Sequence, residues 1–425
     1  MAARWCAARP MTDNRSLLRQ RPYALYLASR LSLIIATQML SVAVGWQVYA
    51  ITRSPLELGF TGLALFLPAF LLAIPGGQVA DRLDRKRIIL VCHAGVASAA
   101  VLLALHARSH STSVRPIYAV LVCLGSIRAF SGPAGQALMP NLVPRAQLER
   151  AVALGSTFWQ VAMIAGPSLG GVLYAALGGA TGVYVCCAAS AAVAFVCVAA
   201  ITVPPAAERP STRDVGETGK KAPVSMSTLL AGIRYVWKDR PILGSITLDL
   251  FAVLLGGAVA LLPIFARDVL VIGPWGLGIL RSAPAVGAAL TALVLSVRPI
   301  QGRAGITMFA GVFVFGLATI VFGASKSFAL SLVALFVLGA ADMVSVVVRS
   351  TLIQLRTPDE MRGRVSAVNM VFIGASNELG EFESGVTAAW LGPELAVIVG
   401  GVGTCVVVLA CLALFPTLRR VDRME

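Results

Sequence analysis

The chain has 425 residues, of which 57% are hydrophobic and 13% are charged, and its mean hydropathy is +0.83. This composition excludes a soluble globular protein and indicates the lipid bilayer as the solvent. The formal charge of +15 does not indicate nucleic-acid binding, because the basic residues separate apolar stretches instead of gathering on one polar face. The apolar runs are continuous rather than alternating, so we expect membrane-spanning helices and not a β-barrel.

Twelve apolar segments follow one another along the chain, each close to the roughly 20 residues that a spanning helix needs. They lie near residues 24–50, 58–80, 88–107, 117–138, 151–176, 183–203, 242–266, 276–297, 305–324, 328–354, 365–391 and 394–416. We therefore expect an all-α membrane protein of twelve transmembrane helices, in two pseudo-symmetric six-helix bundles around a central cavity. The N-terminal bundle would cover residues 1–203, and the C-terminal bundle residues 241–425.

A polar segment over residues 204–240 separates the two sets of spans. It begins at Pro204 and Pro205 and is rich in charged residues, Gly, Ser and Thr, which is typical of a solvated linker. Towards its end, apolar residues recur at helical spacing beside Arg234, Lys238 and Arg240. This pattern predicts a short helix, which fits equally a helix on the inner membrane surface and a cytosolic extension of helix 7.

The basic residues fall mostly on one side of the predicted spans. The loops on the other side hold only Arg53, Arg108, Arg115, Arg267 and Lys326, and four more arginines lie within spans. By the positive-inside rule, we expect both termini to be cytoplasmic. We expect the membrane to be the inner (plasma) membrane. The N-terminus lacks a short apolar core followed by a cleavage site, so we expect a retained first helix.

An internal repeat relates the two halves. A shift of 219 positions lays Leu58 and Gly59 on Leu277 and Gly278, and a shift of 214 positions lays Gly171 on Gly385. Further matches at these shifts pair Arg21 with Arg240, Pro144 with Pro358, Arg150 with Arg364 and Gly166 with Gly380. Parallel repeats of six helices are a known plan of membrane transporters, which handle substrate between the halves near the midplane.

Three motifs occur in order along the first half. The loop from Gly77 to Arg87 includes Asp81, Arg82, Arg85 and Lys86, and it resembles the signature loop of the major facilitator superfamily except for Asp84, where glycine is usual. Helix 4 carries Arg128-Ala-Phe-Ser-Gly132, which is similar to the superfamily's helix 4 motif. Helix 5 carries Gly166-Pro167-Ser-Leu-Gly170-Gly171, which is similar to the motif of its antiporters. That motif usually has a further glycine upstream, where this chain has Ala162.

At finer grain, residues 248–268 and 375–385 resemble the branch that contains the enterobactin exporter and the macrolide-efflux pumps. This resemblance implies the major facilitator fold and proton-linked export from the cytoplasm. It also implies a gating role for the loop with Gly77, Asp81, Arg82, Arg85 and Lys86. Asp81 would latch the start of helix 11 through the helix dipole, or the loop's cations would anchor it among anionic headgroups. Gly166, Pro167, Gly170 and Gly171 would let helix 5 approach a neighbour closely and limit leak, or simply pack tightly.

Ionisable residues inside spans cost ~2.5 kcal/mol or more each, so they usually face a cavity or a partner. The helices that line the cavity in the superfamily, 1, 4, 7 and 10, contain Arg30, Arg128, Asp249, Asp342 and Arg349. The repeat shifts overlay Arg30 on Asp249 and Arg128 on Asp342. We therefore expect two arginine–aspartate pairs that face each other across the cavity, with the aspartates as proton-coupling residues and the three arginines lining the substrate path. The alternative is a static ion pair that only fixes packing.

Helix 11 carries Glu378, Glu381 and Glu383 in its outer half. Glu378 and Glu381 share one face at i, i+3 spacing. We expect Arg281 of helix 8 to pair with Glu381 or Glu383. The alternatives are that Glu378 and Glu381 form a second proton-coupling site, or that these glutamates are exposed to the water outside.

The sequence favours a secondary transporter that exports a small amphipathic molecule by proton antiport with alternating access. A nutrient importer, a lysolipid flippase and a non-transporting scaffold are the alternatives. No nucleotide-binding loop, metal-ligand cluster or catalytic triad occurs, so we expect no enzyme activity, no cofactor and no metal. Energy would come from protons, or from sodium. The expected partners are the substrate, protons and membrane lipids, and the expected state is a monomer.

Overall fold

A computed structural model describes residues 17–202, 226–300 and 302–421, and all its regular elements are helical. The N-terminal group of helices ends before residue 203. Its elements are α2 (Arg21–Thr52), α3 (Pro55–Leu71), α4 (Ala73–Arg82), α5 (Arg85–Arg108), α6 (Arg115–Leu138), η1 (Met139–Asn141), η2 (Arg145–Gln147), α7 (Leu148–Ala176) and α8 (Ala180–Ala199).

The C-terminal group begins with a short helix, α9 (Met226–Lys238). It continues with α10 (Arg240–Leu255), η4 (Ala258–Leu261), α11 (Leu262–Ile264), the π-helix η5 (Phe265–Val269), α12 (Gly273–Val297), α13 (Ala304–Ala324), α14 (Phe328–Arg356), α15 (Asp359–Leu391), α16 (Pro393–Leu414) and α17 (Pro416–Arg419).

Nine helices of the described chain are long and apolar enough to cross a membrane, counting α10 to η5 as one. The pair α3 and α4, bent by 51° at their junction, makes a tenth. The two further long helices, α7 and α15, do not meet this criterion, and each packs one side against the other half of the molecule. These elements correspond to the twelve predicted spans, and the predicted all-α membrane fold is confirmed.

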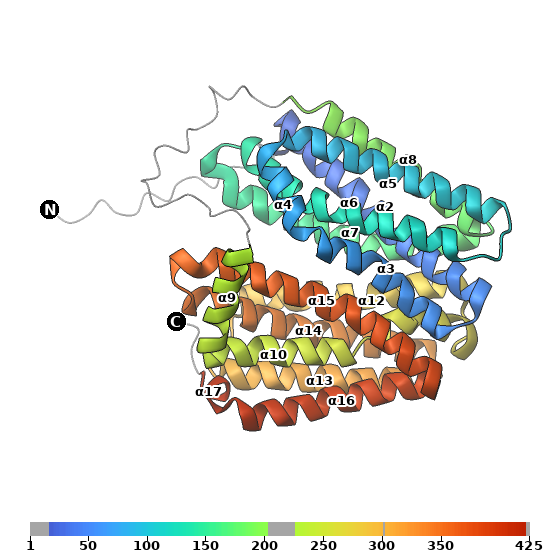
Figure 1. Cartoon of the computed structure of the whole chain (residues 1–425). Coiled ribbons are helices and arrows are strands. Elements are labelled where there is room, and N and C mark those ends of the chain that lie inside the picture. The colour runs from blue at the N-terminus through green and yellow to red at the C-terminus, as the bar shows by residue number, and fades with distance from the viewer. Residues whose placement is uncertain (1–16, 203–225, 301, 422–425) are drawn as a thin grey trace.

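The two groups of helices lie side by side (Figure 1). Within the N-terminal group, α2 packs on α7 and α8, and α5 packs on α6 and α8. Within the C-terminal group, α13 packs on α14 and α16, while α10 packs on α15 and α16. The groups meet mainly through α3 with α15 and α7 with α12. Any central path for a substrate therefore runs between these two contacts.

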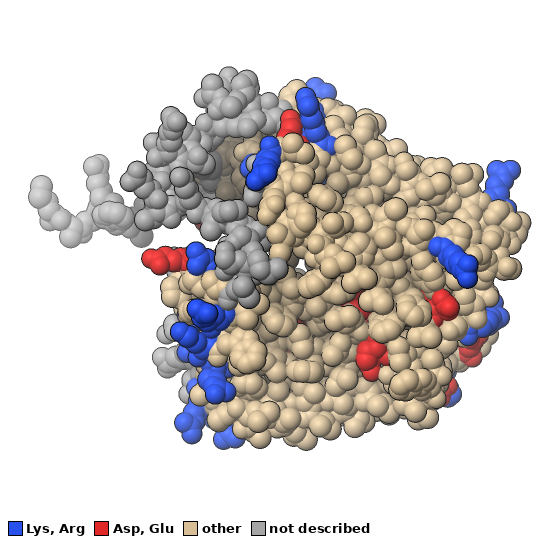
Figure 2. All heavy atoms as spheres, viewed as in Figure 1, with Lys and Arg blue, Asp and Glu red and all other residues tan. Residues whose placement is uncertain are grey.

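The ends of the bundle differ in charge. We call the end at which α2 begins and α16 ends the basic end, and the end with the α2–α3 and α15–α16 connections the distal end. Figure 2 shows Lys and Arg gathered at the basic end of the C-terminal group, followed by a broad band almost free of charge. Such a band has the composition that hydrocarbon requires, and its basic flank has the asymmetry of membrane proteins.

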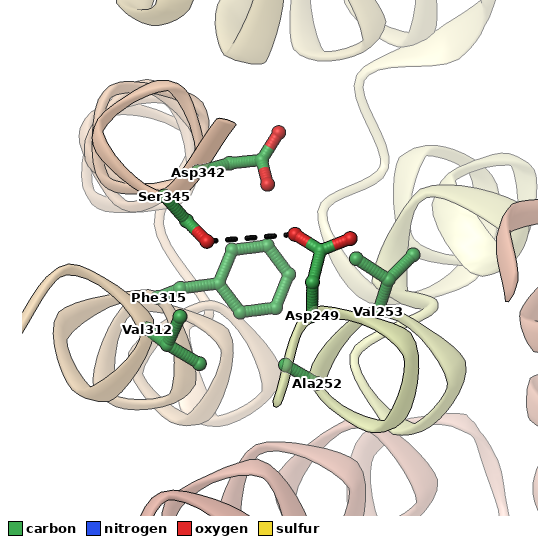
Figure 3. Close-up of a pocket in the computed structure, with 7 residues that line it drawn as sticks. All are labelled: Asp249, Ala252, Val253, Val312, Phe315, Asp342 and Ser345. Carbon is green, nitrogen blue, oxygen red and sulfur yellow. Dashed lines mark hydrogen bonds between the residues drawn. The ribbon is translucent and has the colours of Figure 1, made fainter. Parts of the chain in front are cut away.

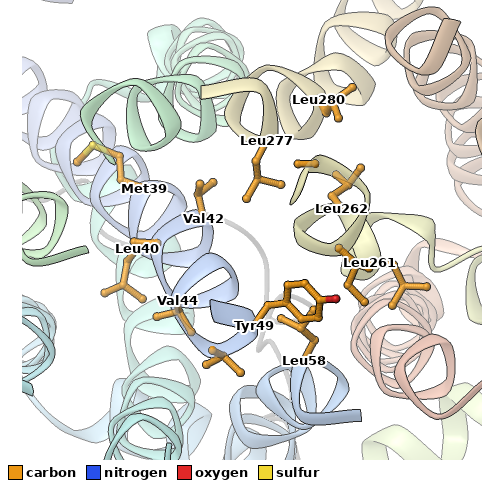
Figure 4. Close-up of a cluster of buried hydrophobic side chains, with 14 of the residues drawn as sticks. Met39, Leu40, Val42, Val44, Tyr49, Leu58, Leu261, Leu262, Leu277 and Leu280 are labelled. Atoms are coloured by element: carbon orange, nitrogen blue, oxygen red, sulfur yellow. The ribbon is translucent and has the colours of Figure 1, made fainter. Parts of the chain in front are cut away.

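The largest apolar core joins both groups near the distal end (Figure 4). Buried side chains of α2, α3, η4, α11 and α12 belong to this core, among them Met39, Leu40, Val42, Val44, Tyr49, Leu58, Leu261, Leu262, Leu277 and Leu280. Separate clusters fill each group nearer the basic end. Shared packing at one end and separate packing at the other means that the halves are closed together distally.

Candidate transport site

A buried ion pair lies inside the C-terminal group, between α10 and α14. Arg349 donates a hydrogen bond to the carboxylate of Asp249, and the side chains are only 3% and 6% exposed. Ser345, one turn from Arg349 on α14, lies 3.5 Å from the other carboxylate oxygen of Asp249. Asp249 is nine residues into α10, roughly 14 Å from the basic end and thus near mid-membrane. Such a pair is costly to bury unless it is fully bonded.

A second carboxylate shares this site. Asp342 and Asp249 both line a small cavity of about 10 Å³, walled otherwise by apolar residues and Ser345 (Figure 3). This volume has room for about one water molecule. Among the described residues Asp342 forms no ion pair, and the Nε of Arg349 has no hydrogen-bond partner. The site therefore holds two carboxylates and one guanidinium, a formal charge of −1 when both acids are ionised.

The structure pairs these charges differently from the sequence-based expectation. Asp249 is bound by Arg349 of its own half and not by Arg30, whose guanidinium instead lies 3.2 Å from the hydroxyl of Tyr26. Arg128 is bound by Glu378 and not by Asp342. The repeat shift identifies equivalent positions, and equivalent positions meet only where they lie on the pseudo-two-fold axis. Arg30 and Asp249 do not.

One ion pair bridges the two halves near the middle of the bundle. The guanidinium of Arg128 on α6 lies 2.7 Å from the carboxylate of Glu378 on α15. Arg128 is 64% exposed, while Glu378 is 15% exposed. Each residue is thirteen positions from the distal end of its helix, roughly 20 Å along the axis. This pair therefore joins the two halves through one exposed and one mostly buried side chain.

Charge reversal tests this bridge. Arg128→Glu places three acids together, with Glu378 and Glu381, and we expect a loss of about 1 kcal/mol of stability, the scale of an exposed pair. Adding Glu378→Arg should restore most of it. Thermal unfolding in detergent gives the readout. If the double variant is no more stable than Arg128→Glu alone, the two side chains do not interact in solution.

Three further charged residues of α12 and α15 are Arg281, Glu381 and Glu383. Arg281 donates a hydrogen bond of 2.9 Å to Ser41 of α2, so it bridges the halves, but the described residues show no ion pair to Glu381 or Glu383. The expected pairing is therefore wrong in this conformation. Glu381 packs against Gly62 of α3, and Glu383 accepts a hydrogen bond from Thr387, one turn away on α15. The i, i+3 geometry turns Glu378 and Glu381 towards the N-terminal group.

Arg30 lies on the face of α2 that turns towards the C-terminal group. Three residues of this face, Ser41, Gly45 and Tyr49, contact the C-terminal group, and Arg30 continues the same stripe towards the basic end. Arg30 is exposed. A Cβ added at Gly132 of α6 or at Gly374 of α15 would meet nothing within 4 Å. The inward faces are thus uncovered nearer the basic end.

Two glycine crossings close the distal end. A Cβ added at Gly171 of α7 would lie 2.8 Å from the Cα of Gly278 on α12. One added at Gly385 of α15 would lie 2.8 Å from the Cα of Gly59 on α3. The repeat relates Gly59 to Gly278 and Gly171 to Gly385, so the two crossings are copies of each other about the pseudo-two-fold axis.

The predicted helix 5 is α7 in the structure. The other residues of its glycine–proline motif pack within the N-terminal group and beside the crossing of Gly171 with Gly278. A Cβ at Gly166 would lie 2.5 Å from the Cβ of Gln38 on α2, and one at Gly170 would lie 2.9 Å from the Cα of Met39. Pro167 is buried, and its carbonyl lies against Gly278. The motif therefore presses α7 onto α2 on one side and onto α12 on the other.

A polar contact that the sequence analysis did not single out lies at the distal end. Tyr49 of α2 donates a hydrogen bond to Asp268 of η5, and the guanidinium of Arg53 lies 3.1 Å from the same carboxylate. Arg267 stacks over Trp46 at 5.8 Å. The shift of 219 lays Tyr49 on Asp268, so this contact lies on the pseudo-two-fold axis. The repeat in the sequence could therefore have identified this contact, because it pairs these two positions.

The signature loop is shorter than expected. Gly77, Asp81 and Arg82 belong to α4, and the Asp81 side chain lies outside the described residues, so its latch stays a prediction. Asp84, the departure from the family pattern, caps α5 by accepting from the backbone N–H of Lys86 at 2.8 Å. Arg85 donates to the carbonyl of Ala137, and Lys86 donates to those of Ala199 and Ile201. These cations fasten the basic ends of α6 and α8.

No group of three or more His, Cys, Asp or Glu side chains within residues 17–202, 226–300 and 302–421 could hold a metal ion.

Solved structures of several transporters share this fold. The structural similarity to the nucleoside transporter NupG has a TM-score of 0.67 at 15% identity, over 94% of this chain and 99% of that one. A bacterial homolog of the human lysosomal transporter Spinster, inward-facing and unoccupied, gives 0.72 at 15% identity over 94% and 97%. The POT family transporter PepTSo gives 0.69 at 13% identity over 95% and 98%.

The sequence is also similar to curated exporters. It is 28% identical to the enterobactin exporter EntS of Citrobacter koseri over 423 residues, which are 96% of this chain and 95% of that protein. It is 27% identical to the EntS of Escherichia coli over 413 residues, with the same coverage. The family model for the transmembrane secretion effector matches residues 16–425. The chain belongs to the transmembrane secretion effector family of major facilitator superfamily transporters.

Proposed function

We propose that this transporter exports a small amphipathic molecule from the cytoplasm in exchange for protons. The observation that carries the proposal is the cluster of Asp249, Asp342 and Arg349, with two acids around one buried cation at mid-membrane. Its formal charge is −1 with both acids ionised and zero with one protonated. Because net charge is expensive at this depth, the cluster favours uptake of one proton.

The proton would be taken up in one conformation and released in the other. Arg349 forms an ion pair with Asp249 in the present conformation. Among the described residues, Asp342 is therefore the acid of this cluster that has no ion pair. Protonation of Asp342 removes the excess charge, and its release lets Arg349 interact with both acids. The same conformational change would move the substrate and the proton across the membrane in opposite directions, which is antiport.

The present conformation supports an opening at the basic end. The glycine crossings and the contact of Tyr49 with Asp268 hold the distal end shut, and the inward faces nearer the basic end are uncovered. With the basic end in the cytoplasm, as the positive-inside rule predicts, this is an inward-facing state that loads substrate from the cytoplasm. The membrane would be the bacterial inner membrane, where both termini lie on the cytoplasmic side.

The exposed guanidinium groups of Arg30 and Arg128 on the N-terminal half favour a substrate with an anionic or hydrogen-bond-accepting group beside an apolar body. The similarity to enterobactin exporters favours export, and a siderophore or another secreted metabolite as the cargo. Drugs of similar chemistry are further candidates. Nutrient import by symport would use the same geometry. Whether substrate and protons move in the same or in opposite directions distinguishes import from export.

The domain division would be residues 1–203 and 241–425, with the linker between them.

The decisive experiment measures coupled flux in proteoliposomes with a pH-sensitive dye inside. Media from a deletion strain and its parent first identify metabolites that the deletion retains in the cells. When a proton gradient is imposed, we expect the compound to cross the membrane in one direction and protons to cross it in the opposite direction. Movement of the compound and of protons in the same direction would support import instead. No proton movement with transported compound would exclude proton coupling.

A further inference from the structure

The short helix α9 has two faces of different character. Gly232 and Val236 are buried, while Arg234, Trp237 and Lys238 are exposed, and Trp237 is 69% exposed. The exposed three lie together because they are spaced at i, i+3 and i+4. An exposed tryptophan between two cations at the end of a membrane bundle is typical of a surface that meets lipid headgroups.

The buried face attaches α9 firmly to the C-terminal group. A Cβ at Gly232 would lie 2.8 Å from the backbone carbonyl of Arg364 on α15. The hydroxyl of Tyr235 donates 2.8 Å to the carbonyl of Arg356 at the end of α14. Val236 belongs to a core cluster with residues of α10, α14 and α15. The helix therefore does not move independently of the transport bundle.

The end of α9 is fixed by a charged residue. Asp239 follows α9, caps α10 through the N–H of Ile242 at 3.1 Å, and forms an ion pair of 3.1 Å with Arg356. These bonds set a sharp change of direction between α9 and α10. Figure 1 shows α9 crossing the direction of the long helices at the basic end. Helix α9 is therefore not a straight continuation of α10.

We propose that α9 binds the headgroups of anionic phospholipids at the basic end of the transporter. Arg234 and Lys238 supply the charge, and Trp237 enters the boundary between headgroups and acyl chains. Charge complementarity selects the occupant, since no acidic residue of α9 lies on this face. Among the described residues of the helix and its junction, the one acid, Asp239, is held by Arg356. The inference concerns binding and does not depend on which substrate is carried.

Brominated lipids test the proposal, because bromine quenches tryptophan only at contact range. The protein is reconstituted in nanodiscs that carry the bromine either on phosphatidylglycerol or on phosphatidylcholine, at equal fractions. The difference between wild type and Trp237→Phe isolates the signal of Trp237 from the other tryptophans. We expect stronger quenching by brominated phosphatidylglycerol. The double variant Arg234→Gln, Lys238→Gln should reduce this preference about 30-fold, as expected from the combined attraction of two basic residues.

The matched control removes two other cations of the same end. Arg419 and Arg420 are exposed at α17, so Arg419→Gln, Arg420→Gln makes the same change in net charge away from α9. We expect it to keep the lipid preference of wild type. The proposal is overturned if Trp237 is not quenched by either lipid, if both lipids quench it equally, or if the control loses the preference as much as the α9 variant does.

Discussion

Asparagine in place of Asp342 is expected to abolish proton-driven transport while leaving the protein folded. Asp342 has no ion pair among the described residues, so the amide fills the same space without leaving a cation unpaired. The cluster then holds one acid and one cation, is already neutral, and has no site for the exchanged proton. Efflux driven by a pH gradient should fall at least about 100-fold, the effect of removing a required proton-transfer group. Counterflow of substrate without a gradient should persist.

Asp249→Asn gives the matched contrast in the same cavity. It leaves Arg349 buried without its partner, and breaking a buried pair in this way costs about 3–5 kcal/mol. We expect a large drop in the unfolding temperature, which a second change, Arg349→Gln, should partly reverse. Unfolding followed by light scattering on purified protein measures both. If Asp342→Asn transports as wild type with a pH gradient, or if it unfolds as readily as Asp249→Asn, the division of roles is wrong.

The second large effect is expected at the glycine crossings. Alanine at Gly171 places its Cβ 2.8 Å from the Cα of Gly278 and 2.5 Å from the carbonyl of Pro274, and backbone atoms do not rotate aside. Helices α7 and α12 must therefore move apart, which opens the distal end. Because Gly385 is the repeat equivalent of Gly171, Gly385→Ala should open the other crossing in the same direction. Each variant should favour the outward-open state and slow transport.

Spin labels report this opening directly. A label on the α5–α6 connection and one on the α13–α14 connection, both at the distal end, give the distance between the halves in a background without cysteines. We expect the distance distribution of Gly171→Ala and Gly385→Ala to gain a longer component. Gly132→Ala is the control, since its added Cβ meets nothing within 4 Å. Unchanged distances in both crossing variants, or the same change in the control, would contradict the role of the crossings in closure.

Much of the architecture could be predicted from the sequence. The predicted span 117–138 compares with α6 at Arg115–Leu138, and the predicted span 305–324 with α13 at Ala304–Ala324. The residues of the crossings also stood out, because Gly59, Gly171, Gly278 and Gly385 were among the few positions that the repeat preserves. Their role in closure followed only from the structure, since the sequence does not state which helices cross.

The partners of the charges were predicted less well. Arg349 was expected on the substrate path and was given no partner, and it binds Asp249. Glu378 was expected as a proton-coupling residue without a stated partner, and it binds Arg128. Both residues were identified as intramembrane charges that need a partner. Which partner each one finds depends on how far each helix is rotated about its axis and on which neighbour it packs against. Sequence spacing along one helix contains neither quantity.

The sequence by itself determined the solvent, the lengths of the spans, the duplication and the identity of the costly charges, because hydrocarbon acts on each segment according to its own composition. Only the tertiary structure decided which charges neutralise each other and which end of the molecule is closed. Ion pairs form over a few ångströms between helices far apart in the chain, and the balance between closed ends is a property of the whole assembly of helices. The repeat connects the two levels where residues lie on its axis, as Tyr49 and Asp268 do.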